Sequence, residues 1–236
     1  NTAVGYSALW KNLASNNTSF GYNTLSENTT GTRNTAIGAY ALDGNTTVSD
    51  CTAVGYAALT AANTGTNNSA FGSAAMQTNT SGHSNTGLGR YALQANTTAS
   101  GNTAVGNNAM YTNTTGGDNT AVGDTTLMAN TTGARNTAVG HESLDANTTG
   151  DNNTAVGEGA GGSITTGSTN TSVGQGAAAA ITTGSNNACL GHDAGRTSSP
   201  SGNITTGSNI ICLGNNSITD LYCADTSISS SDKRDK

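Results

Sequence analysis

The chain has 236 residues and a formal net charge of −6, with only two phenylalanines and one tryptophan. Leu, Ile, Val and Phe together make up about 13 per cent of it, which is too little for a large globular core. Its few lysines and arginines are scattered, which excludes a basic stripe for nucleic acid, and no apolar run reaches the roughly 18 residues that a membrane-spanning helix needs.

The chain carries an internal repeat, which we align on the residue before a recurring glycine. Successive reference residues are 16 apart once, 17 apart ten times and finally 23 apart. Such a period is typical of a solenoid, so we predict an all-β parallel β-solenoid, or β-roll, of about thirteen 17-residue coils over residues 1–214. The reference residues are Val4, Phe20, Ile37, Val54, Phe71, Leu88, Val105, Val122, Val139, Val156, Val173, Leu190 and Leu213.

Each coil begins with asparagine, three residues before the reference residue, in eleven of the thirteen coils. Cys51 and Ile210 are the exceptions. Stacked asparagines can hydrogen-bond from coil to coil, as they do in cross-β assemblies. This column therefore predicts a structural amide ladder.

The Thr-Ala-Val-Gly segment that follows alternates, as a short strand does. Thr and the reference residue share one face, and Ala and Gly share the other. We expect the reference residues to point into the core. The alanines, such as Ala36, Ala104 and Ala138, would then form a flat outer surface.

A small residue and then a large one follow, four and five positions after the reference residue, as in Ala109-Met110. We expect this pair to form a second strand whose Leu or Met completes the core. The glycine directly after each reference residue indicates a positive φ or a close backbone approach. A second glycine, within Asn-Thr-Thr-Gly, indicates a turn.

The chain has a weak core for its length. Each coil buries about two large side chains, worth roughly 1.5 to 3 kcal/mol each, whereas ordering each residue costs roughly 1 to 2 kcal/mol. We therefore predict a parallel homo-oligomer, a homotrimer, that packs through the alanine face.

The repeat changes from about residue 156. Gly161, Ala178 and Gly195 replace the Leu/Met column, and a new aliphatic column appears at Ile164, Ile181 and Ile204. The insertion at 198–203 predicts a surface loop. Residues 215–230 are no longer periodic and predict a cap or neck.

Candidate binding residues stand in the most variable, outward column and beside it. Aromatic rings there could stack on sugars, although variation on a scaffold surface also explains them. The candidates are Tyr6, Tyr22, Tyr40, Tyr56 and Tyr91.

His141 and His192 lie three coils apart, so no metal site is expected, and no motif indicates a cofactor or a repeat-borne enzyme. Cys189 and Cys212 share one column and are expected to replace alanine there rather than to form a disulfide.

The string Asn-Thr-Ala-Val-Gly-x-x-Ala-Leu-x-x-Asn-Thr-Thr-Gly resembles the repeats of tail-fibre-domain proteins of bacteriophages and bacterial surfaces. It is more distantly similar to the β-roll heads of trimeric autotransporter adhesins. The resemblance covers about residues 1–215. It implies a homotrimeric virion structural protein, a tail fibre or appendage for host attachment.

The end of the chain, Ser231-Asp232-Lys233-Arg234-Asp235-Lys236, resembles the start of the intramolecular chaperone domain of endosialidase-type tail spikes. In that family the domain aligns three chains and then cuts itself off. The resemblance implies Ser231 as the nucleophile and Lys236 as its base. The resemblance is limited to residues 231–236 and does not include the body of that domain.

Two further interpretations remain open. A bacterial trimeric surface adhesin, extracellular rather than on a virion, would be built from the same coil. An ice-binding solenoid would need a regular outward Thr array, whereas the adjacent Thr pairs fall in turns. A host cell-surface glycan or protein is the expected partner besides the chain itself.

Overall fold

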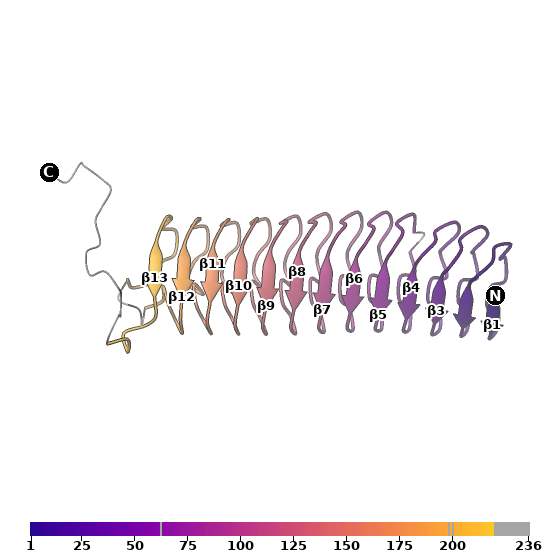
Figure 1. Ribbon diagram of the computed structural model, residues 1–236, viewed down its shortest axis with the longest axis horizontal. Coiled ribbons are helices and arrows are strands. Elements are labelled where there is room, and N and C mark those ends of the chain that lie inside the picture. The colour runs from indigo at the N-terminus through magenta and orange to yellow at the C-terminus, as the bar shows by residue number, and fades with distance from the viewer. Residues whose placement is uncertain (62, 198, 200, 220–236) are drawn as a thin grey trace.

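The computed structural model describes residues 1–61, 63–197, 199 and 201–219. It is an elongated stack of coils, with one strand per coil, as Figure 1 shows. The strands form a single parallel sheet in sequence order, so the predicted β-solenoid is confirmed. They are β1 (Thr2–Val4), β2 (Thr18–Phe20), β3 (Thr35–Ile37), β4 (Thr52–Val54), β5 (Ser69–Phe71), β6 (Thr86–Leu88), β7 (Thr103–Val105), β8 (Thr120–Val122), β9 (Thr137–Val139), β10 (Thr154–Val156), β11 (Thr171–Val173), β12 (Ala188–Leu190) and β13 (Ile211–Leu213).

The repeat sets the register of the sheet. Thr103 pairs with Thr120, and Val105 pairs with Val122, so equivalent residues stack in columns. Across the 23-residue step the register is kept, because Cys189 pairs with Cys212. Within the described residues no helix is long and apolar enough to cross a membrane.

The two faces of the sheet are the reverse of the expected ones. Ala104 is fully buried, as are its equivalents in β3 to β5 and β8 to β10, whereas Phe20 is 56% exposed and Leu88 is 48% exposed. The alanine column therefore lies in the core and the reference column lies on the surface. The prediction of an outer alanine face is wrong, because only small side chains fit between the sheet and the opposite wall of the coil.

The opposite wall supplies the large core residues but is not a second strand. Leu25, Met76 and Met110 are fully buried, as predicted. Their backbones are left-handed, with φ of 48°, 50° and 51°. The segment is a run of turns, closed by bonds such as Asn113 N–H to the Met110 carbonyl at 3.2 Å and linked to the next coil by Met110 N–H to the Thr126 carbonyl at 3.0 Å.

The recurring glycine meets both expectations. Gly106 has a φ of 140°, and a Cβ there would lie 2.1 Å from the carbonyl oxygen of Gly123 in the next coil. No L-residue with a side chain fits this position without a shift of the backbone.

Two buried asparagine columns connect the coils. In the predicted column, the backbone N–H of Asn119 donates to Oδ1 of Asn102 at 2.9 Å, and Nδ2 of Asn102 donates to the Gly116 carbonyl at 3.0 Å. In a second column, Nδ2 of Asn130 donates to Oδ1 of Asn113 at 2.8 Å. The amide of Asn113 also donates to the Gly116 carbonyl, so one turn carbonyl joins the two columns.

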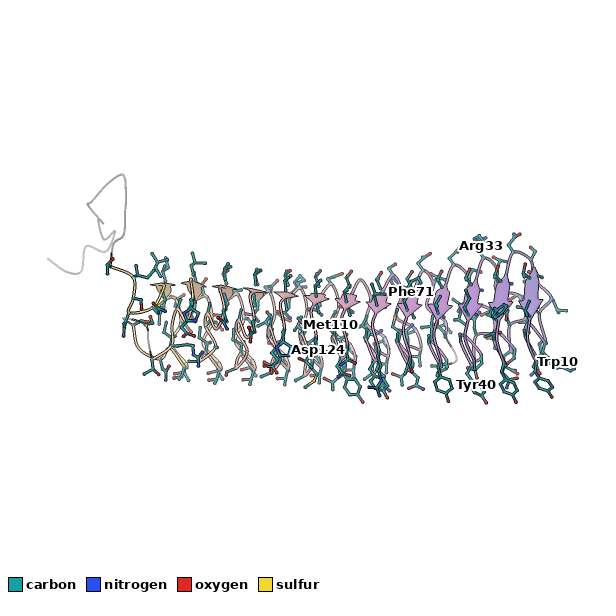
Figure 2. The ribbon with its side chains drawn as sticks, turned by 90° about the horizontal axis from the view of Figure 1, so that it is seen from below. Trp10, Arg33, Tyr40, Phe71, Met110 and Asp124 are labelled. Atoms are coloured by element: carbon teal, nitrogen blue, oxygen red, sulfur yellow. The ribbon has the colours of Figure 1, made fainter. Side chains whose placement is uncertain are left out.

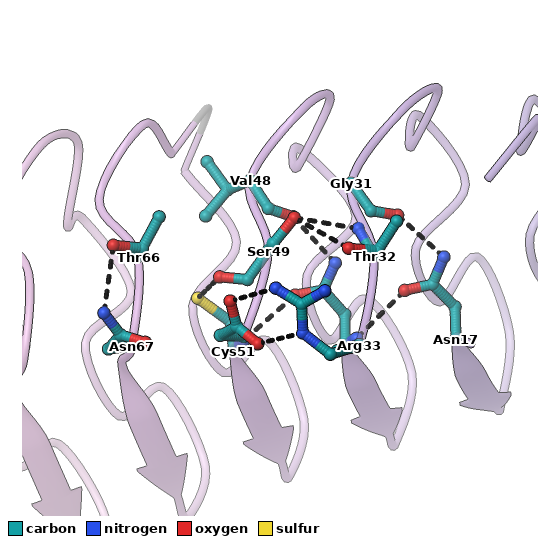
Figure 3. Close-up of polar contacts among 11 residues, drawn as sticks. Asn17, Gly31, Thr32, Arg33, Val48, Ser49, Cys51, Thr66 and Asn67 are labelled. Carbon is teal, nitrogen blue, oxygen red and sulfur yellow. Dashed lines mark hydrogen bonds and ion pairs between the residues drawn. The ribbon is translucent and has the colours of Figure 1, made fainter. Parts of the chain in front are cut away.

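Cys51 replaces asparagine in the first column without breaking it (Figure 3). Its backbone N–H donates to Oδ1 of Asn34 at 3.0 Å, and its thiol lies 3.6 Å from the carbonyl oxygen of Gly65. Burial raises the pKa of the Cys51 thiol. The group therefore stays protonated and can donate where an amide would.

We call residues 1–155 the front coils and residues 156–214 the rear coils. In the rear coils Ile164 and Ile181 are fully buried beside Gly161 and Ala178, as expected from the redrawn repeat. Ile164 stands 17 residues after Asn147 and takes the place of the second asparagine column. Oδ1 of Asn147, where that column ends, is buried and has no hydrogen-bond partner among the described residues.

The insertion after β12 is only partly described. Thr197 and Ser201 are exposed, but Ser199 is buried, with Oγ 2.9 Å from Sγ of Cys212. The insertion therefore covers the end of the core instead of lying wholly at the surface. Of the expected cap or neck, the range 220–230 lies outside the described residues.

Candidate functional site

The outer face of the sheet runs along all thirteen strands, and its reference residues were expected in the core. We call the outward threonine and reference columns of β1 to β13 the sheet face. In ten of the thirteen strands threonine begins the strand and an aliphatic or aromatic reference residue ends it. Exposed members include Val4, Ile37, Phe71, Val122, Val156, Val173 and Leu190, each between 36% and 48% exposed.

A signal in the sequence could have assigned the two faces. The reference column accepts Phe20, Phe71 and Leu88, whereas the alternate column holds only Ala, Ser, Gly or Cys. A column that accepts large and small residues alike has open space beside it, and a column restricted to small residues does not. Residue size, rather than hydrophobicity, distinguishes the two faces.

Four of the five candidate tyrosines form one continuous row along the front coils. Tyr6 and Tyr22 stack with ring centroids 5.3 Å apart and an interplanar angle of 12°. Tyr40 lies edge-on to Tyr22 at 5.4 Å and to Tyr56 at 5.9 Å. We call these four residues the tyrosine row. It lies on the turns after the strands, where Tyr40 and Trp10 project away from the side that carries Arg33 (Figure 2).

The fifth tyrosine, Tyr91, belongs to a separate cluster. Its ring lies edge-on to Tyr111 at 6.0 Å, and the Arg90 guanidinium lies 4.3 Å from its centroid. Arg90 Nη2 also donates to the Tyr91 hydroxyl at 3.0 Å. Tyr91 therefore already has partners for its ring face and for its hydroxyl.

The corresponding turns of the rear coils carry charged and polar groups. Together with Glu142 of the last front coil, they line an open groove of about 340 Å³ that includes Glu158, His192, Asp193 and Arg196. Arg196 Nη1 donates to Oδ1 of Asp193 at 2.8 Å, and His192 Nε2 lies 3.6 Å from Oδ2 of the same carboxylate. Arg196 and Asp193 thus form an ion pair within the groove.

No metal centre forms in the described part of the chain. There, the structure brings together no group of three or more His, Cys, Asp or Glu side chains that could hold an ion. His141 lies near Asp124 and Glu142, at 3.8 Å and 3.7 Å, and does not meet His192. The predicted catalytic pair, Ser231 and Lys236, lies outside the described residues.

The three described cysteines are free and buried. Cys189 replaces an inward alanine, as expected, and burial together with the neighbouring Cys212 raises its pKa to about 11. The thiol therefore stays protonated near neutral pH and is a poor nucleophile.

Comparison with known protein families, curated proteins and solved structures found no match to this chain. The class defined by the fold is that of β-solenoid repeat proteins.

Proposed function

We propose that the chain is a rigid structural segment of a homotrimeric fibre, in which three copies run parallel and pack along the sheet face. The observation that carries this proposal is the outward apolar reference column, which is present in every strand and is exposed in ten of the thirteen, with Val54, Val105 and Val139 half-buried. Monomeric proteins rarely leave so long an apolar surface in water. A surface of this kind favours a protein partner.

The size of the sheet face fits an interface. Thirteen strands at about 4.8 Å spacing and about 10 Å in length give a flat footprint of roughly 600 Å² per copy. Side-chain relief increases that area toward the roughly 800 Å² per partner of a standard interface. The sheet face therefore replaces the alanine face as the proposed contact surface between copies, because the alanines are already buried within each chain.

The resemblance of the repeats supports a viral tail fibre or appendage that takes part in host-surface attachment. A bacterial trimeric surface adhesin built from the same coil is the alternative, and its location would be the cell surface. The genes beside this one separate the two, since neighbouring virion structural genes would exclude the adhesin. The resemblance at Ser231 and Lys236 supports self-cleavage as the one catalytic step proposed for the chain.

One observation favours a second candidate, ice binding. The sheet face carries an outward threonine column, for example Thr86, Thr103 and Thr120, at the regular spacing of the strands. An ice-binding surface must be flat and free in solution. Large side chains such as Phe20 and Phe71 in the adjacent column make the face uneven, so we favour the protein partner.

The decisive measurement is the native mass of the particle by light scattering. We expect three chains for the wild type and one folded chain when Val122→Glu and Val156→Glu place charges on the sheet face. Thr132→Glu, at an exposed turn position, is the matched control and should stay trimeric. A wild-type mass of one chain would overturn the trimer, and thermal hysteresis by that single chain would support ice binding instead.

A further inference from the structure

The tyrosine row is not required by the packing of the coil. Tyr6 is 71% exposed and Tyr56 is 60% exposed, while the core of these coils is supplied by inward alanines and by the Leu/Met column. Tyr40 has a φ of 62°, in the left-handed region, where an aromatic residue is disfavoured. The chain thus places a large ring at a position better suited to Gly or Asn, which are its equivalents at Gly159 and Asn23.

The polar ends of the rings are available as well. Among the described residues, no hydrogen bond is formed by the hydroxyls of the tyrosine row, in contrast to the hydroxyl of Tyr91. A tyrosine that is buried in a protein normally has a hydrogen-bond partner for its hydroxyl. These four side chains therefore offer an apolar ring surface and a free hydrogen-bonding group together.

The shape of the row indicates an elongated ligand. The rings follow one another once per coil along the rod, with centroids 5.3 to 5.9 Å apart. The near-perpendicular angles of 74° and 87° at Tyr40 keep the rings from closing into one continuous stack. The row is narrow, so it fits an extended chain better than a folded protein surface.

The charges of the side chains on these coils indicate which kind of elongated ligand the row can bind. On the same coils as the row, Lys11 is paired with Glu27, and Asp43 lies in the following coil without a cationic partner among the described residues. The three charges sum to −1, from one positive and two negative groups. Arg33 is paired with Asp50 and lies on the other side of the coil. A polyanion, such as a nucleic acid or an acidic polysaccharide, would find no free cation there.

We propose that the tyrosine row binds an extended, uncharged polysaccharide chain that lies parallel to the rod axis. The apolar faces of its sugar rings lie against the tyrosine rings, and the phenolic hydroxyls exchange hydrogen bonds with sugar hydroxyls. This binding rests on the proposed role in host-surface attachment and gives that role a ligand class and a location on the front coils.

The test is binding of the full chain to an array of neutral and acidic glycans, followed by titration of the strongest neutral glycan. We expect retention on neutral glycans and not on heparin. The double variant Tyr22→Ala/Tyr40→Ala, at the centre of the row, should bind about tenfold more weakly, the effect of losing one to two aromatic contacts. The pair Tyr22→Phe/Tyr40→Phe keeps the rings, so its loss should be smaller than that of the alanine pair.

Tyr91→Ala is the matched control, because Tyr91 and Tyr40 occupy the same position of the coil and both have positive φ, 59° and 62°. It should bind as the wild type does. Retention on no neutral glycan, or equal binding by the wild type and the Tyr22→Ala/Tyr40→Ala variant, overturns the proposal. Native mass is recorded for every variant, so a trimer that fails to bind glycans refutes only this inference, whereas a single chain that binds them refutes only the trimer.

Discussion

The front and rear coils solve the same packing problem with different residues. In the front coils a Leu or Met fills the core and an asparagine three residues later continues the second amide column, as Leu127 and Asn130 do. In the rear coils the large residue becomes Gly or Ala, and an isoleucine replaces the asparagine, as at Ala178 and Ile181. The two positions change together.

The geometry explains why they change together. A Cβ on Gly161 would lie 3.1 Å from Cδ1 of Ile164, so the isoleucine occupies the space that a leucine at 161 would need. The exchange keeps the core filled and gives up one column of side-chain amide bonds. A coil of this width can therefore hold one large apolar side chain in its turn wall, at either of two positions.

The largest expected effect comes from placing the core residues of a rear coil into a front coil. Leu127→Ala leaves a cavity in a fully buried site, and it should lower the free energy of unfolding by about 2 to 5 kcal/mol. Adding Asn130→Ile places the isoleucine of the rear coils beside the new alanine. The double variant should be more stable than the sum of the two single changes predicts, by roughly 1 to 3 kcal/mol.

Urea unfolding of the four proteins at one fixed chain concentration measures this coupling. The single variant Asn130→Ile is the necessary control, because it removes the amide bonds to Asn113 and Gly133 without making room for the added volume. Strict additivity of the two single effects would contradict the shared-space explanation.

A smaller effect is expected at the junction between the regions. Gly161 follows the last leucine of the column, and a Cβ there would lie 2.9 Å from Cδ2 of Leu144. Gly161→Ala should therefore cost about 2 to 3 kcal/mol, from the left-handed backbone and the close contact together. Ala178 in the next coil is tolerated, since the residue one coil before it is a glycine.

Gly159→Ala separates the two causes at that junction. Gly159 has a φ of 61°, close to the 63° of Gly161, but a Cβ there would meet nothing within 4 Å. Thermal unfolding should show a cost of about 1 to 2 kcal/mol for this control, the backbone contribution alone. Equal losses of unfolding free energy for Gly161→Ala and Gly159→Ala would mean that the contact with Leu144 does not contribute to the cost.

The smallest effect is expected on the exposed turns, where the two regions again differ. Arg33 donates to both carboxylate oxygens of Asp50 in the front coils (Figure 3), whereas the equivalent rear pair is neutral, with Asn186 Nδ2 donating to Asn209 Oδ1 at 2.7 Å. Exposed ion pairs add little to stability. Asp50→Asn should shift the urea midpoint only slightly, and high salt should remove that shift.

The pH dependence of this pair has a definite sign. The hydrogen bonds from Arg33 lower the pKa of the Asp50 carboxyl. Its contribution is therefore present above the pKa of the unfolded carboxyl and is lost as the pH falls through the lower folded value. Asp50→Asn should remove the difference in urea midpoint between neutral and acidic buffer that this pair causes, and Asn209→Ala in the rear coils should leave that difference unchanged.

The sequence alone determined the period, the position of the Thr-Ala-Val strand and the register, because each follows from recurrence at fixed spacing; the second strand that it predicted in each coil is a run of turns. It also identified the glycine column, the first asparagine column and the large core residues of the turn wall, such as Met110. Each of these columns depends on a local backbone or packing requirement that only one or two residue types meet, so the column can be recognised in the sequence.

Only the tertiary structure decided which face of the sheet lies inside. Alternation along Thr103-Ala104-Val105 defines two faces but is the same whichever of them is buried. The choice depends on the space left by the opposite wall, which is a run of left-handed turns with one large side chain per coil. That wall admits an alanine and excludes a valine or a phenylalanine, so the more hydrophobic column lies at the surface.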